Sequence, residues 1–250
     1  MRVDTGDKAG IGGFIITGSG QKRVLIRAIG PSLTQSGVSD VLADPTLELY
    51  HSGPDSIAFN NNWRDTQEAS IKATGIPPVN DFEAPIDATL APGHYTAVVR
   101  GNNSGTGAAL IEVYDLDQAS GKLANISTRA FVSTGADVTI AGFILGNKSG
   151  ASGVVIRGLG PSLAASGVTG SLSNPALELR DGDGVLLATN NDWHDDPVQA
   201  AKLIATGLAP SDNHEAGIAA TLPPGRYTAL LAGENNSTGI GLVEVYVLEP

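Results

Sequence analysis

Residues 23–33 read Arg-Val-Leu-Ile-Arg-Ala-Ile-Gly-Pro-Ser-Leu, and residues 153–163 read Gly-Val-Val-Ile-Arg-Gly-Leu-Gly-Pro-Ser-Leu. Both stretches are short apolar runs that end in the same Gly-Pro-Ser-Leu turn. Arg27 and Arg157 lie 130 positions apart, and the two turns have the same separation. A strand-like run that recurs with its turn at such a distance indicates an internal repeat. The chain is therefore predicted to contain two copies of one unit.

Each copy consists of short apolar runs separated by Gly, Pro and Asn turns, which is typical of β-strands. One helix is expected in each copy. In the first it covers residues 65–75, where Asp65 and Glu68 resemble a capping box; in the second, Asp196 precedes Pro197 at the helix start. We therefore predict an all-β fold of two tandem antiparallel β-sandwich, jelly-roll-like domains, each with one short helix.

The expected domains are residues 1–121, which lack a first strand, and residues 122–250. Residues 122–129 alternate enough to form a strand, but Met1 aligns with Ala130, so the first copy has no counterpart of that run. Pro250 aligns with Gln118, so no spare copy of the run follows. If the run belongs to the second domain, the first has an unfilled position; if it pairs with the first, the second is incomplete. Either way we expect an open sheet edge that pairs with a neighbouring chain, or a fragment of a longer array.

Composition excludes several classes of protein. The chain has 250 residues, no cysteine and a net charge of −11. That charge repels nucleic acid and anionic lipid, so no nucleic-acid partner is expected. No apolar run approaches the roughly 20 residues of a membrane helix, so no membrane insertion is expected. Few lysines and many Gly, Thr, Ser and Asn residues favour an extracellular or cell-surface location.

The closing segment of the first copy runs from Pro92-Gly93-His94-Tyr95-Thr96 through Gly107 to Glu112-Val113-Tyr114. It resembles the closing hairpin of bacterial jelly-roll accessory domains attached to secreted proteins. The whole unit, with residues 122–129 and the Asn-Trp-Arg-Asp segment, resembles a tandem repeat of long secreted proteins from environmental bacteria. This resemblance implies a β-sandwich and an extracellular setting, and it brings no catalytic residues.

No catalytic set is evident. No histidine occupies the same place in both copies, and thiol catalysis is excluded because cysteine is absent. The strands do repeat an arginine and two glutamates. These residues could form structural Arg–Glu ion pairs or, alternatively, a carboxylate pair for carbohydrate chemistry. We favour the structural interpretation for all six: Arg27, Glu48, Glu112, Arg157, Glu178 and Glu244.

Two loops, residues 60–65 and 190–195, are rich in oxygen ligands and each carries a tryptophan. Calcium prefers such oxygens, and Asn62, Asp65, Asp192 and Asp195 are the candidate ligands. The alternative is a turn whose Asn and Asp side chains bind local backbone. Trp63 and Trp193 could stack on sugar rings or could cover a core. No other cofactor is expected.

These observations predict a non-catalytic extracellular structural or adhesive repeat that self-associates end to end into an array or fibre. The alternative is a carbohydrate-binding accessory module of a secreted protein, which the tryptophan loops motivate. A hydrolase is a distant third hypothesis, because the duplication repeats no catalytic set.

Overall fold

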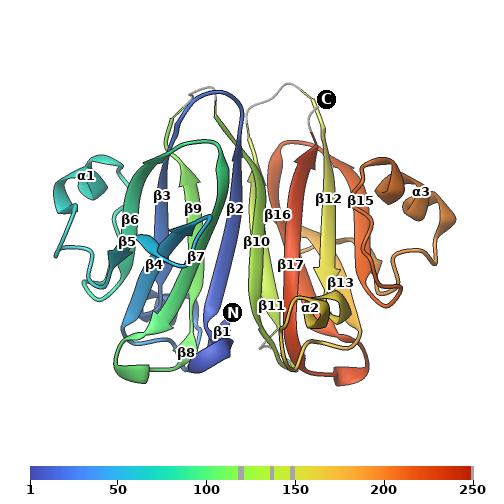
Figure 1. Cartoon of the computed structure of the whole chain (residues 1–250), viewed down its shortest axis with the longest axis horizontal. Coiled ribbons are helices and arrows are strands. Elements are labelled where there is room, and N and C mark those ends of the chain that lie inside the picture. The colour runs from blue at the N-terminus through green and yellow to red at the C-terminus, as the bar shows by residue number, and fades with distance from the viewer. Residues whose placement is uncertain (118–120, 136–137, 147–149, 249–250) are drawn as a thin grey trace. The chain divides into compact units, whose positions relative to one another are not determined.

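The computed structural model describes residues 1–117, 121–135, 138–146 and 150–248. Its backbone separates into two compact units, Met1–Ala124 (unit 1) and Asn125–Pro250 (unit 2). Each unit is built from antiparallel strands joined by tight turns and short helices (Figure 1). The predicted all-β sandwich class is confirmed.

Over its described residues, unit 2 is an eight-stranded jelly roll. One sheet has the order β15-β12-β17-β10 and the other β11-β16-β13-β14, so strands one, three, six and eight of the unit share a sheet. All the pairings within these two sheets are antiparallel. Two sheets in this strand order define a jelly roll. The strands are β10 (Lys122–Val132), β11 (Thr139–Leu145), β12 (Ser152–Leu159), β13 (Pro175–Asp181), β14 (Leu186–Asn190), β15 (Ala216–Leu222), β16 (Gly225–Gly233) and β17 (Gly239–Leu248).

Unit 1 repeats this order with one position largely unfilled. Its sheets are β6-β3-β9 and β2-β7-β4-β5. The place that β10 takes in unit 2 is represented by β1 (Arg2–Val3), which pairs with β8 (Gly107–Ala108). The other strands are β2 (Gly10–Thr17), β3 (Lys22–Ile29), β4 (Pro45–His51), β5 (Ser56–Asn60), β6 (Ala84–Leu90), β7 (Gly93–Gly101) and β9 (Leu110–Asp115).

Each unit has its own core between its two sheets, made mainly of aliphatic side chains. Strand β2 shows how the sequence achieves this, because its residues alternate strictly between buried and half-buried. Phe14 stacks on Tyr95 in unit 1 with ring centroids 5.3 Å apart, and Phe143 stacks on Tyr227 in unit 2 at 5.5 Å. These aromatic pairs occupy equivalent places in the two copies.

The Gly-Pro-Ser turn is held by a buried glutamate. In unit 1 the side chain of Glu83 is fully buried, and its Oε1 accepts from Gly30 N at 3.3 Å, from Ser32 N at 2.9 Å and from the Ser32 hydroxyl. A Cβ atom at Gly30 would lie 2.1 Å from the Leu42 carbonyl oxygen, so glycine is required there. The carboxylate therefore pairs the backbone donors that begin the short 3₁₀-helix Pro31–Ser36.

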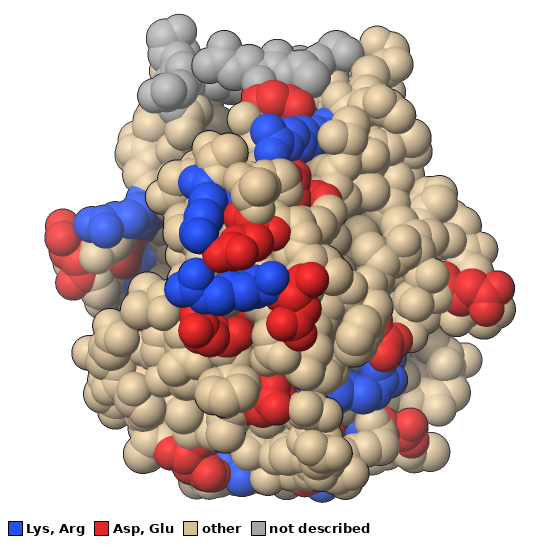
Figure 2. Space-filling view, turned by 90° about the vertical axis from the view of Figure 1, so that its left-hand side faces the viewer, with Lys and Arg blue, Asp and Glu red and all other residues tan. Residues whose placement is uncertain are grey.

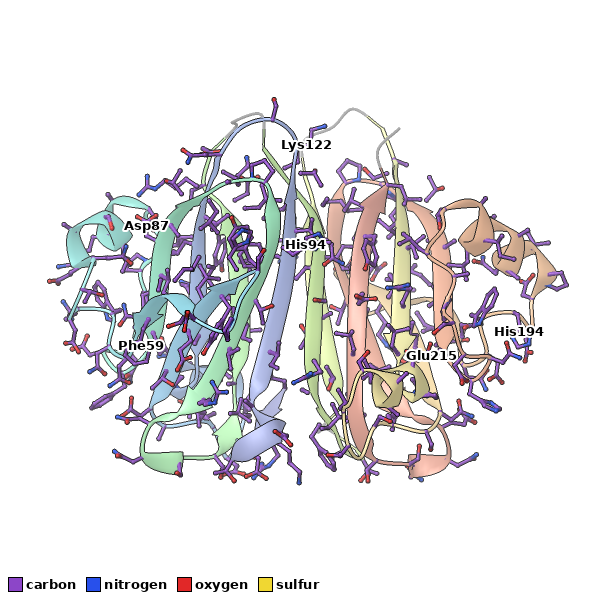
Figure 3. All side chains as sticks on the ribbon, viewed as in Figure 1. Phe59, Asp87, His94, Lys122, His194 and Glu215 are labelled. Carbon is purple, nitrogen blue, oxygen red and sulfur yellow. The ribbon has the colours of Figure 1, made fainter. Side chains whose placement is uncertain are left out.

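Unit 2 repeats this arrangement. Glu215, which lies beside α2 (Pro161–Ala165) in Figure 3, is fully buried, and its Oε1 accepts from Gly160 N and Ser162 N, both at 3.0 Å. A Cβ at Gly160 would meet the Leu172 carbonyl oxygen at 2.1 Å. Because this turn forms a short α-helix, unit 2 has two α-helices rather than the single helix expected from the sequence.

The two main helices begin differently. In unit 2, α3 (Pro197–Ala205) starts as predicted: Asp196 accepts from Val198 N at 2.8 Å and Pro197 occupies the first turn. In unit 1, α1 (Glu68–Ala73) is shorter, and the predicted capping box is wrong. Its N-cap is Gln67, without a capping side chain. Asp65 instead accepts from the side chain of Asn62, and Glu68 forms ion pairs with Arg64 and Lys72.

We predict that Glu83→Gln lowers the free energy of unfolding of unit 1 by about 1.5–3 kcal/mol, because the neutral amide weakens several hydrogen bonds to a buried charge. Urea unfolding measures the effect. Ser32→Ala, which removes one of the donors, should cost less, about 1 kcal/mol. Equal stability of wild type and Glu83→Gln would contradict this role.

Candidate functional site

Arg27 forms a three-residue cluster on the sheet of unit 1 that holds β9. Its Nε donates to Glu112 Oε2 at 2.8 Å, and its NH2 donates to the same oxygen at 2.5 Å. The NH2 group also donates to the Tyr114 hydroxyl at 3.0 Å, and that hydroxyl donates to Glu112 Oε1 at 2.8 Å. The Arg27 and Glu112 side chains are only 14% and 22% exposed. Burial raises the pKa of the Tyr114 hydroxyl, and its hydrogen bond to Glu112 is the second cause of this increase.

The remaining donor of this cluster reaches across to another segment. Arg27 NH1 donates to the backbone oxygen of Ile76 at 2.7 Å, just after the α1 helix. We call the segment between β5 and β6 that carries α1, and the equivalent segment between β14 and β15 that carries α3, the helical insert. Arg27, Glu112 and Tyr114, together with this backbone bond, form what we call the arginine clasp, because they tie the helical insert to the sheet. Unit 2 has the same clasp. Arg157 NH2 donates to Glu244 Oε2 at 2.5 Å and to the Tyr246 hydroxyl at 3.3 Å, and Arg157 NH1 donates to the backbone oxygen of Leu208 at 3.4 Å.

Glu48 and Glu178 do not belong to the clasps. Glu48 lies in β4, in the opposite sheet, where it accepts from Tyr50 and lies 4.0 Å from Arg100. Glu178 pairs with Arg180 of its own strand at 2.6 Å. Glu48 and Glu112 therefore bind different partners in different sheets. The arrangement joins no two of these acids into a carboxylate pair for glycoside chemistry.

We predict that Arg27→Met lowers the free energy of unfolding of unit 1 by about 2–4 kcal/mol, because it leaves the half-buried Glu112 without its counter-charge. Arg157→Met should do the same in unit 2. Thermal melting measures both. The control is Arg100→Met: that pair is long and Arg100 is 49% exposed, so the cost should stay below about 0.5 kcal/mol. Unchanged melting of both clasp variants would refute a structural role.

Trp63 belongs to a small core beneath the helical insert. It packs with Leu25 and Ile71, and it is only 3% exposed. The Arg64 guanidinium lies 4.3 Å from its ring centre. Neither ring face is open to a sugar in this structure. Trp193 is half-buried, and its indole N–H donates to the Asp212 backbone oxygen at 3.1 Å. Both tryptophans thus anchor the insert.

The candidate calcium ligands lie in local turns. The side-chain Nδ2 of Asn62 donates to Asp65 Oδ2 at 2.9 Å, and Asp65 N donates to the backbone oxygen of Asn62 at 3.0 Å. In unit 2, Asp195 N donates to the Asp192 backbone oxygen at 3.1 Å, and His214 lies 3.6 Å from the Asp192 carboxylate. Within the described ranges, no three His, Asp or Glu side chains gather as a metal site would require. Local turn bonds account for these side chains only in part. Among the described residues, the Oδ1 atoms of Asn62 and Asp192 are buried and accept no hydrogen bond.

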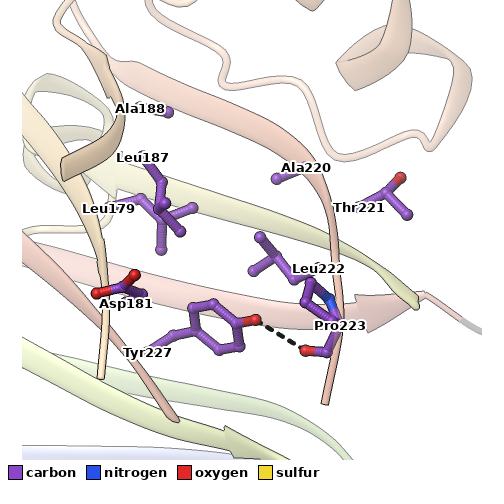
Figure 4. Close-up of a pocket in the computed structure, with 9 residues that line it drawn as sticks. All are labelled: Leu179, Asp181, Leu187, Ala188, Ala220, Thr221, Leu222, Pro223 and Tyr227. Atoms are coloured by element: carbon purple, nitrogen blue, oxygen red, sulfur yellow. Dashed lines mark hydrogen bonds between the residues drawn. The ribbon is translucent and has the colours of Figure 1, made fainter. Parts of the chain in front are cut away.

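An apolar pocket opens in unit 2 between the ends of its two sheets (Figure 4). Its one charged group, Asp181, uses Oδ1 to accept from Asp183 N and Val185 N in its own turn. In unit 1 the equivalent residue is His51, whose ring stacks on Tyr95 at 4.6 Å. The pocket thus offers no acid–base pair. Its lining residues are Leu179, Asp181, Leu187, Ala188, Ala220, Thr221, Leu222, Pro223 and Tyr227.

The helical insert protects one sheet edge in each unit. The Gln67 side chain binds the backbone of the edge strand β6 as a neighbouring strand would. Its Nε2 donates to the backbone oxygen of Asp87 at 2.8 Å, and its Oε1 accepts from Asp87 N at 3.2 Å. Figure 3 shows Asp87 beside α1. In unit 2, Gln199 accepts from Ala219 N of β15 at 3.1 Å. Covering an edge with a helix prevents unwanted strand pairing.

Strand β9 forms the opposite edge of the same sheet in unit 1. It pairs with β3 and, in the part of unit 1 that the structure describes, has no strand on its other side along Leu110–Asp115. The core-facing residues Ile111 and Val113 are only partly buried, and Leu110 is 40% exposed. In unit 2 the equivalents of Ile111 and Val113 are Val243 and Val245, which are 0% and 1% exposed because β10 covers them. This open edge is the candidate functional site.

The charges on the side of unit 1 that carries α1 are balanced (Figure 1 and Figure 2). On the face shown in Figure 2, acidic and basic side chains lie interleaved rather than in one large patch of a single sign. Asp87 pairs with Arg23 through two bonds of 3.0 and 2.7 Å, and Lys22, with a side chain 2% exposed, pairs with Asp115 and Asp117 at 3.0 Å. Such local pairing gives the surface no preference for polyanions.

Comparison with known proteins identifies no family. No family model matches the chain, and no curated protein matches it. Among solved structures, the chain is similar to the major capsid protein P2 from bacteriophage PM2, with 13% identity, 100% of this chain and 98% of that chain covered, and a TM-score of 0.23. A chain in the structure of Sulfolobus Turreted Icosahedral Virus shows 11% identity, 99% and 85% coverage, and a TM-score of 0.27. TM-scores this low do not establish a shared fold, so the jelly-roll assignment rests on the strand order.

Sequence reasoning missed the structural role of two residue pairs. Glu83 and Glu215 hold the Gly-Pro-Ser turns, and Gln67 and Gln199 cap the edge strands. The available signal was their retention in both copies at the same spacing of 132. It did not say which groups they would bind, because each partner lies in a segment distant in sequence or in the backbone of another strand.

The Arg23–Asp87 pair predicts an acid-dependent loss of stability. The bonds from Arg23 lower the pKa of Asp87. A carboxylate with a lowered pKa stabilises the fold above its unfolded pKa of about 3.9, and this stability is lost as the pH falls through the folded value. We therefore expect Arg23→Gln and Asp87→Asn to show a coupling energy at pH 7 that declines as the pH falls below about 3.9 and is lost below the lowered pKa of Asp87. Urea unfolding of the single and double variants tests this, and a coupling that did not change with pH would contradict it.

Proposed function

We propose that this chain is a non-catalytic structural repeat that associates with other copies through the open edge of β9. One observation carries the proposal: core-facing side chains that β10 buries fully in unit 2 are only partly buried in unit 1. An unpaired edge with apolar neighbours favours the addition of another strand. The helical insert protects the other edge of the same sheet, which leaves β9 as the side of that sheet where a partner can add.

The arrangement of polar side chains supports a structural rather than a catalytic role. The arginine clasps, the buried glutamates and the tryptophans all bind groups of the protein itself. The four histidines differ between the copies, and the pocket residue Asp181 of unit 2 is replaced in unit 1 by His51, whose ring stacks on Tyr95. A repeated catalytic function would need the same groups in both copies.

The setting that we propose is the cell surface or the extracellular medium, as composition favours. Within the described residues, no helix is long and apolar enough to cross a membrane. A carbohydrate-binding role gains no support from Trp63, since its ring is buried. We therefore retain the assembling structural repeat as the proposed function.

The test is the molar mass in solution as a function of protein concentration, measured by size-exclusion chromatography with light scattering. Wild type should exceed the monomer mass of 25.4 kDa as concentration rises. Leu110→Lys should lower this association, because a lysine on an edge strand opposes strand addition.

The matched control is Leu242→Lys in unit 2. Leu242 occupies the place of Leu110, but its strand already pairs with β10, opposite Arg129. This variant should associate as the wild type does. A wild-type chain that stays monomeric at every concentration, or equal effects of both substitutions, would contradict assembly through β9.

A further inference from the structure

The two units show the same site in two states, filled and open. In unit 2, β17 pairs with β10 in an unbroken antiparallel register from Asn125 opposite Tyr246 to Val132 opposite Gly239. In unit 1, only the end of this register is present: Arg2 lies opposite Ala108 and Val3 opposite Gly107, and Met1 exchanges hydrogen bonds with Ala109. The open part of the edge begins at the next residue of β9, Leu110.

Unit 2 shows which side chains the filled site requires. On the core side of β10, Ala130 and Thr128 are 2% and 8% exposed, and Ile126 packs against the core. These residues alternate with Ser127 and Arg129, which face outward. Met1 already holds the place of Ala130, so the open edge from Leu110 to Tyr114 requires the equivalents of residues 125–129. The occupant is thus an extended segment of five residues, with small or apolar residues inward and polar residues outward. At about 3.4 Å per residue, it spans roughly 17 Å.

The outer face of the open site matches the filled one. In unit 2, Ser127 lies opposite Glu244, and Asn125 lies opposite Tyr246. Glu244 and Tyr246 are both members of the unit 2 clasp. In unit 1, Glu112 and Tyr114 occupy the same places in β9 and form the same clasp with Arg27. A strand that fits beside β17 therefore meets the same groups beside β9.

We infer that unit 1 accepts, beside β9, a strand of the β10 sequence type supplied by another copy of the repeat. The strand runs antiparallel to β9 and places the equivalents of Ile126 and Thr128 over Val113 and Ile111. The chain's own β10 is not the donor, because its residues 125–132 already pair with β17. This inference rests on the proposed function and specifies the partner chemistry of that site.

The first experiment supplies the strand within the chain. Residues 122–129 are copied in front of Met1, so that the copy of Arg129 continues directly into the Met1–Val3 segment that already holds the end of this register. The copied strand should cover Ile111 and Val113. We expect the melting temperature of unit 1 to rise by at least about 5 °C. Amide exchange along Leu110–Asp115 should slow by at least about tenfold.

The matched control carries the same extension with aspartate in place of the copies of Ile126 and Thr128. It has the same length and the same outward-facing residues, but it places charges toward the core. It should leave both the melting temperature and the amide exchange of β9 at wild-type values. Equal stabilisation by both extensions, or by neither, would overturn the inference.

The second experiment supplies the strand in trans. A synthetic peptide of residues 122–129 is titrated into the full chain, and binding is measured by calorimetry and by amide exchange of β9. One peptide should bind per chain, and a peptide with proline at the Thr128 position should bind at least about tenfold more weakly, since proline cannot donate to a strand ladder. The chain with the cis extension should no longer bind the peptide. Failure of the wild-type chain to bind would overturn the inference.

These outcomes separate the inference from the proposed function. A wild-type chain that stays monomeric, yet binds the peptide and is stabilised by the extension, supports the strand-accepting site and contradicts self-association. A chain that assembles while neither peptide nor extension protects β9 supports assembly through another surface and overturns the inference.

Discussion

The structure depends on one constraint: the backbone N–H and C=O groups along a sheet edge need partners or solvent, and the apolar residues behind them need cover. Unit 2 meets this demand on one edge with β10 and on the other with the α3 insert. Unit 1 meets it with α1 at β6 but leaves Leu110–Asp115 of β9 without a neighbouring strand inside the unit. The edge of β17 is covered and that of β9 is a candidate interface because unit 2 has the strand β10 at this position.

Buried charges fix the parts of the fold that aliphatic packing leaves free. Glu83 collects the backbone donors of the Gly-Pro-Ser turn, and Arg27 joins β3, β9 and the segment after α1. In each case a charged group compensates its own burial by pairing several partners at once, which is the condition under which a buried charge is tolerated. The helical insert is thereby held in place to cover β6.

Duplication also shows how small changes redirect local bonding. Asn190 accepts from Gly217 N at 2.8 Å, whereas the equivalent of Gly217 in unit 1 is Pro85, which has no N–H. Asn60 there donates instead to the Pro85 oxygen at 2.7 Å. In the same way, His51 covers Tyr95, while Asp181 turns back to bind its own loop. The framework of the fold persists through these substitutions because the strand pairing does not depend on them.

The duplication, the all-β class and the start of α3 could be predicted from the sequence, because turn residues, strand alternation and an Asp-Pro helix start are local signals. The sequence also indicated that residues 122–129 form a strand without a counterpart in the first copy. It did not determine that Arg27 pairs with Glu112 rather than Glu48, that Trp63 is buried, or that β10 lies beside β17. Those outcomes depend on which strands become neighbours, and alternation within a strand carries no information about its partner. They follow from the strand order, which brings β3 beside β9 and leaves the far side of β9 open.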